Sequence, residues 1–93
     1  MFARVSTYTP GPQSTGAPSE QTVQKVLEMP GCQGIYYLYG NDRSISITLW
    51  ADDGALKGSH QAAERIRDET SAEQGMTVRS VEEFEVLTRR LKD

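Results

Sequence analysis

Met-Pro-Gly-Cys-Gln-Gly-Ile-Tyr-Tyr-Leu-Tyr-Gly-Asn-Asp-Arg-Ser-Ile-Ser-Ile-Thr-Leu-Trp, residues 29–50, is the stretch that decides the fold. It contains two runs rich in β-branched and aromatic residues on either side of a turn-forming segment, which is typical of a β-hairpin. Asn41 and Asp42 tolerate the positive φ angles that a two-residue hairpin loop needs. We therefore expect a hairpin in which Gly40 pairs with Arg43.

This register sorts the hairpin side chains onto two faces, because successive residues of a strand point to opposite sides of the sheet. The aliphatic face comprises Tyr36, Leu38, Ile45, Ile47 and Leu49. The aromatic and hydroxyl face comprises Ile35, Tyr37, Tyr39, Ser44, Ser46, Thr48 and Trp50. Neither is plainly a solvent face, so both need a cover, and packing alone favours the aliphatic face as the one that meets helices.

Composition bounds the kind of protein. Ninety-three residues, 37% of them hydrophobic and 25% charged, predict one globular domain over 1–93. The net charge of −3 and the absence of a basic patch argue against nucleic acid as a partner. No apolar run approaches the roughly 18 residues of a membrane span. The single Cys32 permits no disulfide within the chain, and we expect a cytoplasmic protein that does not engage a membrane.

The segments before the hairpin predict a strand, a loop and a helix. Residues 2–8 alternate with a two-residue period, so they predict the first strand. Residues 9–19 hold three prolines and two glycines, and we expect a mobile loop that can be shortened at little cost in stability. Ser19 can cap a short helix, which Pro30-Gly31 would end.

The segments after the hairpin predict a longer helix and a last strand. Asp52 or Asp53 can cap a helix that runs from about Gly54 to Gln74, and Gly75 is its expected stop. A stripe of small and medium residues should face the sheet: Leu56, Ser59, Ala63, Ile66 and Thr70. Residues 77–87 predict a strand with a β-bulge near Glu82 or Glu83, and 88–93 a polar tail.

The resulting order is strand, helix, strand, strand, helix, strand. It predicts an α+β, ferredoxin-like βαββαβ fold. Two thin helices cannot cover both apolar faces of a four-stranded sheet, so we expect an obligate homodimer in which two copies join across one face.

Three stretches carry a resemblance to a known family: residues 29–34, residues 46–56 and residues 81–86. They resemble the antibiotic biosynthesis monooxygenase-like family, whose members form dimeric α/β barrels. The resemblance covers most of the chain except residues 9–19. It implies a cofactor-independent monooxygenase-like protein that acts on, or binds, a small aromatic or quinone-like compound.

The resemblance also suggests site residues. The cofactor-free members pair a strand Trp, here Trp50, with an Asn four residues earlier and an Arg on the second helix. This chain has Ser46 in place of the Asn, and Arg67 on the second helix is the candidate for the Arg. The resemblance would also put Ser46 and Trp50 in a cavity on the helix side, contrary to the packing argument, so the face that meets the helices stays open. Trp50 would wall the pocket or simply anchor strand to helix, while the hydroxyls of Tyr37 and Ser46, opposite one another in the hairpin, would bind the ligand.

His60 is the only histidine, at the margin of the helix stripe, where it would be an acid–base group or a solvated side chain. Arg4 is the only charged residue of the first strand, and it would bind an anion or form an ion pair at the strand end. The sequence contains no haem-ligand pattern, no phosphate-cradling glycine motif and no metal-ligand spacing, so no cofactor and no metal are expected. Two functions stay open: a small-molecule enzyme or binder, and a noncatalytic dimeric scaffold or interaction module.

Overall fold

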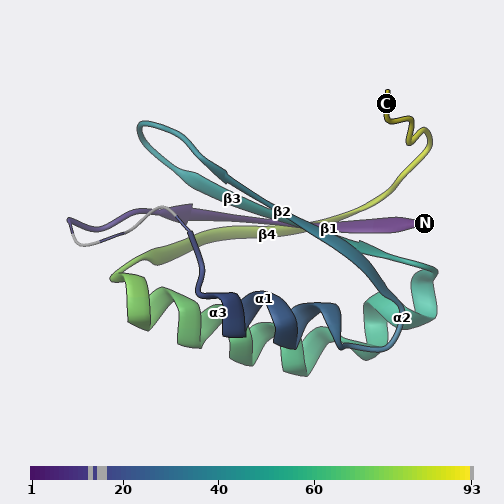
Figure 1. Ribbon diagram of the computed structural model, residues 1–93, viewed down its shortest axis with the longest axis horizontal. Helices are drawn as coiled ribbons and strands as arrows, with labels where there is room; N and C mark the ends of the chain where they lie inside the picture. The colour runs from purple at the N-terminus through teal and green to yellow at the C-terminus, as the bar shows by residue number, and fades with distance from the viewer. Residues whose placement is uncertain (13, 15–16, 93) are drawn as a thin grey trace.

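A computed structural model describes the chain except for residues 13, 15, 16 and 93. Its elements are β1 (Phe2–Thr9), α1 (Glu20–Leu27), β2 (Cys32–Tyr39), β3 (Ser44–Trp50), α2 (Asp53–Gly58), α3 (His60–Gln74) and β4 (Thr77–Glu85). The four strands form one antiparallel sheet in the order β2-β3-β1-β4, and the helices all lie on one side of it (Figure 1). The predicted ferredoxin-like α+β fold is confirmed.

The hairpin register is the predicted one. Tyr37 pairs with Ser46 and Tyr39 with Ser44, and the Gly40 N–H donates to the Arg43 carbonyl at 2.8 Å. The expected loop conformation is wrong, because no residue other than glycine has a positive φ in the described part of the chain. The pairing of the flanking strands therefore fixes the register without a mirror-image turn.

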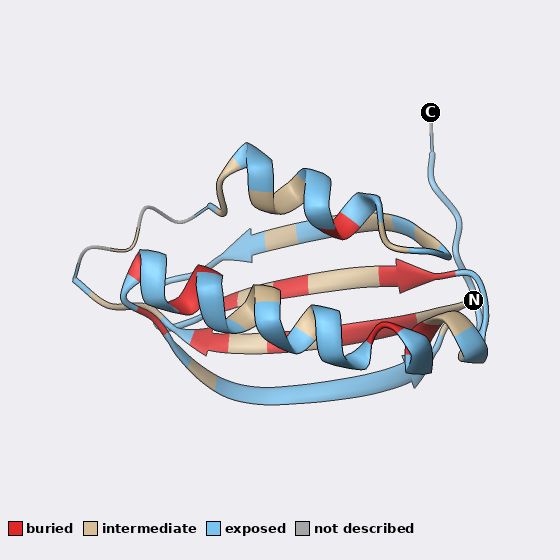
Figure 2. Ribbon diagram, turned by 90° about the horizontal axis from the view of Figure 1, so that it is seen from below, coloured by how far each residue is buried: buried red, intermediate tan, exposed pale blue. Residues whose placement is uncertain are grey.

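Packing alone favoured the aliphatic face of the sheet as the one that meets the helices, and the structure shows the opposite. The hydroxyl and aromatic face lies under the helices, where Ser46 and Trp50 are buried. The aliphatic face is open, and Tyr36, Leu38 and Phe84 each expose nearly half of their surface. Figure 2 shows that the buried residues gather on β1, β3 and the inner sides of the helices, whereas β4 is exposed almost throughout.

The predicted helix caps are confirmed, but the long helix is divided. The Ser19 hydroxyl accepts from the Thr22 N–H at 3.2 Å, and the Asp52 carboxylate accepts from the Ala55 N–H at 2.8 Å. Gly75 ends α3 in the left-handed conformation, with φ 65°.

The single helix expected from Gly54 to Gln74 is two helices that meet at Ser59. The Leu56 carbonyl would accept from the N–H four residues on in an unbroken helix. Here it accepts instead from Arg4 Nη2 at 2.9 Å and from the Ser59 hydroxyl at 2.7 Å. The helical hydrogen-bond pattern resumes with the bond from the Ala63 N–H to the Ser59 carbonyl, at 2.8 Å.

The β-bulge expected near Glu82 or Glu83 is wrong. The pairing of β4 with β1 shifts between Thr7 and Tyr8, where Arg79 is the extra residue on β4. From Ser80 onward the alternation is regular, since Val81 pairs with Ser6 and Phe84 with Ala3. These two side chains therefore lie on opposite faces, and their spacing of three residues needs no bulge.

The loop between β1 and α1 begins after Thr9, which belongs to the strand. Its expected mobility falls in part on residues 13, 15 and 16, which lie outside the described residues. Of the described ones, Ser14 donates to the buried Gln74 side chain at 3.2 Å, and Gln74 donates to the Ala17 carbonyl. No helix among the described residues is both long enough and apolar enough to cross a membrane.

Gly31 holds the junction between α1 and β2 close to α2. Its φ is +81°, its carbonyl accepts from the Ala51 N–H at 2.8 Å, and a Cβ there would lie 2.3 Å from Ala55 Cβ. We predict that Gly31→Ala lowers the free energy of unfolding by about 2 kcal/mol or more, because it adds strain and a clash.

Urea unfolding followed by circular dichroism measures this effect. Gly58→Ala is the matched control, because a Cβ there meets nothing within 4 Å, and helix propensity predicts unchanged or higher stability. Equal midpoints for the two variants would contradict the close approach at Gly31.

Candidate functional site

A hollow lies between the helices and the covered face of the sheet. Its walls come from β1 (Arg4, Ser6, Tyr8), β2 (Ile35, Tyr37), β3 (Ser46, Thr48, Trp50), the α1 region (Pro18, Thr22, Val26, Met29) and α3 (Ala63, Ile66, Arg67, Thr70). Its volume is about 50 Å³. That is room for a few water molecules and well below the ~300 Å³ at which pockets for drug-sized ligands begin.

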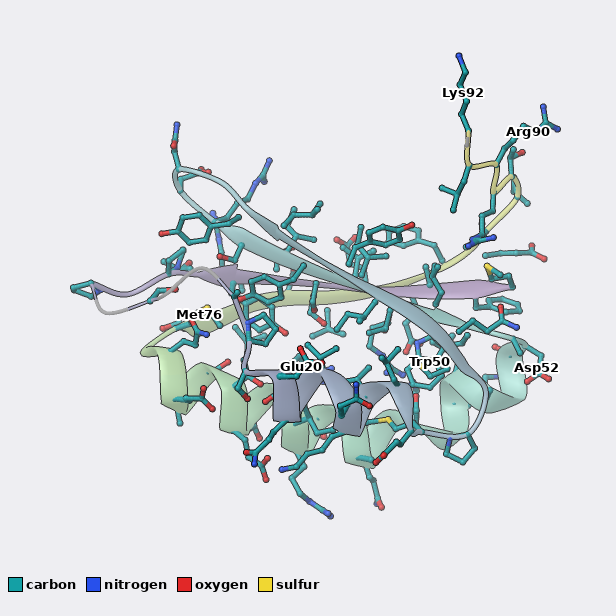
Figure 3. All side chains as sticks on the ribbon, viewed as in Figure 1. Glu20, Trp50, Asp52, Met76, Arg90 and Lys92 are labelled. Atoms are coloured by element: carbon teal, nitrogen blue, oxygen red, sulfur yellow. The ribbon has the colours of Figure 1, made fainter. Side chains whose placement is uncertain are left out.

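Trp50 forms one end of the hollow. Its side chain is fully buried, and Figure 3 shows it between the sheet and the helices, at the end where α2 lies. The indole Nε1 donates to the Thr48 hydroxyl at 2.9 Å. The Arg4 guanidinium carbon lies 5.4 Å from the centre of the ring, which is cation–π distance.

Arg4 is the most constrained charged group of the site, with 3% of its surface exposed. Nε and Nη2 donate to Glu83 Oε2 at 3.2 and 3.1 Å, and Nη2 also reaches the Leu56 carbonyl. Nη1 is buried and has no acceptor among the described residues. Burial lowers the pKa of Arg4, and Glu83 partly offsets this effect by stabilising the cation.

Hydroxyl groups line another part of the hollow. The Tyr8 and Ser46 hydroxyls are 3.2 Å apart, and the Tyr8 and Tyr37 rings are stacked with their centres 6.3 Å apart. The Tyr37 hydroxyl donates to Met76 Sδ at 3.3 Å, and Met76 lies at the opposite end of the sheet from Trp50 (Figure 3). Burial raises the pKa of Tyr37, which keeps this phenol protonated as a donor.

The hollow is electrically one-sided. Arg67 on α3 lines it together with Arg4, and its charge contributes to lowering the pKa of Arg4. No aspartate or glutamate belongs to the lining that the described residues provide. Glu83, which is not part of this lining, neutralises Arg4. Arg67 therefore leaves the interior of the hollow with a surplus of positive charge.

His60 lies outside this arrangement. Its side chain is 53% exposed, and Nε2 is 2.7 Å from Glu83 Oε2, on the carboxylate that also binds Arg4. Burial alone would raise the pKa of Glu83, but hydrogen bonds from His60 and Arg4 outweigh it and hold the pKa below its usual range. His60 therefore reaches the hollow only through Glu83 and Arg4.

The structure brings together four of the five residues that the sequence suggested: Trp50, Arg67, Tyr37 and Ser46 line the hollow, and His60 does not. Sequence reasoning did not assign Tyr8 or Thr48 to the site and favoured an ion pair for Arg4, which the structure confirms. The available signal was the alternation of β1, which places Arg4, Ser6 and Tyr8 on one face.

Burial raises the pKa of the Cys32 thiol, which opposes a role as a nucleophile. Within the described residues, no three His, Cys, Asp or Glu side chains come together as a possible metal site.

No family model and no curated protein matches the sequence. Among solved structures, the chain is similar to a mutant of SnoaB, a cofactor-independent oxygenase from Streptomyces nogalater. The TM-score is 0.67 at 16% sequence identity, over 95% of this chain and 94% of that one. The two proteins share a fold. The resemblance to monooxygenase-like proteins is thus confirmed for the architecture, while the roles of individual residues rest on the geometry described above.

The shared carboxylate of Glu83 predicts a pH-dependent stability. Because its folded pKa is lowered, its contribution is complete above the ordinary carboxyl pKa of about 4.3 and is lost as the pH falls through the folded value. We predict that Glu83→Gln is less stable than the wild type at pH 7 and that the gap narrows below about pH 4.

Thermal unfolding from pH 7 to pH 3 measures this difference. Glu64→Gln, a change at an exposed position of α3, should leave stability nearly unchanged at both ends of the range. A gap between wild type and Glu83→Gln that stays constant with pH would contradict the linkage.

Proposed function

We propose that this chain binds a small aromatic, quinone-like compound in the hollow and oxidises it with molecular oxygen, without a bound cofactor. The observation that carries the proposal is the wall formed by Trp50, stacked against Arg4 at the cationic end of a cavity whose other polar groups are largely hydroxyls. Its location beneath the helices, in the fold of a cofactor-independent oxygenase, supports the same conclusion.

In the proposed reaction the substrate supplies the electrons. A phenolate ring is electron-rich enough to reduce oxygen; one oxygen atom becomes a ring carbonyl and the other leaves as water, so a phenol and O₂ give a quinone and H₂O. The protein contributes positioning and stabilisation of the phenolate, which are the roles that fixed donors perform in a site that excludes water.

The roles follow from position. Trp50 is the flat wall, and the Arg67 and Arg4 guanidiniums stabilise the negative oxygen. The Tyr37 and Ser46 hydroxyls orient the polar groups at the other end of the ligand. His60 contacts the site only through Glu83 and does not take the substrate's hydroxyl proton. The phenol therefore ionises by releasing this proton to solvent.

A bound ring needs more space than the hollow has, and α1 is the wall that can yield. It has eight residues, of which only Val26 is buried. Its ion pair with α3, Lys25 to Glu69 at 3.5 Å, is exposed on both sides and contributes little. The segment that leads into α1 also reaches the site, because Pro18 lines the hollow.

Oxygen uptake in the presence of a panel of hydroxyarenes tests the activity. We predict uptake above the buffer rate, and a loss of at least tenfold in kcat/KM for Trp50→Phe, because a smaller ring withdraws the wall. Tyr39→Phe, at the exposed end of the hairpin, is the control and should keep full activity. Wild-type protein without uptake on any member, or an unaffected Trp50→Phe variant, would refute an oxygenase site at Trp50.

We also propose that a second copy of the chain covers the aliphatic face. The open side carries a continuous set of apolar residues on neighbouring strands: Val5, Tyr36, Leu38, Ile45, Ile47, Leu49 and Phe84. Exposed apolar surface of this kind is unfavourable in water, and a two-fold axis would bury it against the same face of a second copy.

Ile47 lies on β3, on this open face. We predict that Ile47→Glu abolishes the dimer or unfolds the chain, because it places a charge in the centre of the apolar face. Leu91→Glu, in the exposed tail, should leave the dimer intact. Sedimentation equilibrium measures both, and a stable folded wild-type monomer at micromolar concentration would exclude the obligate dimer.

The alternative is a noncatalytic dimeric scaffold in the same fold. The small volume of the hollow favours it, as does the Trp50 ring that Arg4 already covers. A dimer that binds no hydroxyarene and consumes no oxygen would select this alternative. For either function we propose a cytoplasmic location, because the single thiol of Cys32 is free.

A further inference from the structure

Arg4 has donor capacity that the protein itself does not use. A guanidinium carries five N–H donors, and those of Nε and Nη2 are taken up by Glu83 and the Leu56 carbonyl. Nη1 has no acceptor among the described residues although it is buried. A buried donor without an acceptor is unfavourable, and in native structures it points to a bound group or water. Arg4 lines the hollow, so its unused donors mark a place for an acceptor there.

The guanidinium is also held in place before any ligand arrives. Glu83 fixes it from β4, the Leu56 carbonyl fixes it from α2, and the Trp50 ring lies against its face. Three contacts from three elements leave the planar group little freedom to turn. A ligand oxygen that accepts from Nη1 therefore pays little ordering entropy for this side chain.

The charge of the hollow selects the kind of acceptor. Arg4 and Arg67 both line it; Glu83 neutralises Arg4, but no carboxylate of the described lining balances Arg67. Thr70, one turn beyond Arg67 on α3, adds a second buried polar atom without a partner, its hydroxyl oxygen. A neutral carbonyl would satisfy a hydrogen bond, but an anionic oxygen also offsets the surplus positive charge.

The remaining walls of the hollow determine which apolar part of a ligand fits there. Trp50, Ile35 and Ile66 offer flat and branched apolar surfaces, which suit an aromatic ring. The volume of about 50 Å³ favours the smallest such body, a single ring, because a larger one would need a greater outward movement of α1.

We propose that Arg4 is a ligand-binding residue of this cavity and that its Nη1 anchors the acidic oxygen of a single-ring aromatic anion, a carboxylate or an acidic phenol. This deepens the proposed function, on which it rests for the use of the same cavity, by naming the charge and size of the ligand. Glu83 is a positioning residue that holds the guanidinium in the orientation that leaves Nη1 free.

The test compares two probes that differ in charge and little else, 2-hydroxybenzoate and 2-hydroxybenzamide, at pH 7. Trp50 is the only tryptophan, so its indole N–H signal in a ¹H–¹⁵N spectrum reports binding at this site. We expect the anion to bind at least tenfold more tightly than the amide. The side-chain N–H signals of Arg4 should shift with the anion and not with the amide.

Arg4→Lys keeps a positive charge beside Glu83 but lacks the second terminal nitrogen, and it should lower the affinity for the anion at least tenfold. Arg43→Lys, in the exposed hairpin loop, is the matched control and should change nothing. If Arg4→Lys does not fold, the Arg4 N–H signals of the wild type decide the question alone.

Equal affinities for the two probes, unshifted Arg4 signals, or an Arg4→Lys variant that binds the anion normally would each overturn the proposal. Oxygen uptake is measured separately. A protein that oxidises neutral hydroxyarenes but ignores charge refutes the anion anchor only, and one that binds the anion through Arg4 without oxygen uptake refutes the oxygenase only.

Discussion

The buried guanidinium of Arg4 is the constraint on which the architecture around the site depends. It joins β1 to β4 through Glu83, to α2 through the Leu56 carbonyl, and to β3 through the ring of Trp50. Its contact with the Leu56 carbonyl lies where α2 and α3 meet at a break instead of running on. Desolvating a charge is costly, and the arrangement persists because Glu83 and the carbonyl compensate it.

The sheet buries its more polar face, which inverts the usual pattern of a half-covered antiparallel sheet. The cost of the inversion is partly offset because some of these polar groups find partners within the layer: Tyr8 with Ser46, and Trp50 with Thr48. Polar groups that are hydrogen-bonded can be buried at moderate cost in free energy. An entirely apolar interior would provide no groups to orient a ligand. The aliphatic side chains are consequently displaced to the outside, where only another apolar surface suits them.

Local signals in the sequence were sufficient for the elements and insufficient for their long-range adjustments. The hairpin register and the caps at Ser19, Asp52 and Gly75 depend on residues close in the chain, and all four are as predicted. The helix break at Ser59 was not predicted. The Leu56 carbonyl there accepts from Ser59 itself and from Arg4, more than fifty residues away, and only the second contact lies beyond the reach of a local pattern. The extra residue at Arg79 likewise depends on how β4 meets β1. The same holds for the site, in which Arg4 and Glu83 come from opposite ends of the chain and His60 pairs with Glu83 at the surface.

The alternation of β1 and β3 links the two proposed surfaces physically. Arg4 and Thr48 point toward the hollow, while their neighbours Val5 and Ile47 point to the open face, on the same two hydrogen-bonded strands. A shift of either strand that accommodates a ligand therefore moves the apolar face by the same amount. If a second copy covers that face, its grip on Val5 and Ile47 also fixes the positions of Arg4 and Thr48. A ligand that favours one arrangement of these strands then changes the affinity between the two copies. By thermodynamic linkage, the second copy changes the affinity for the ligand by the same factor.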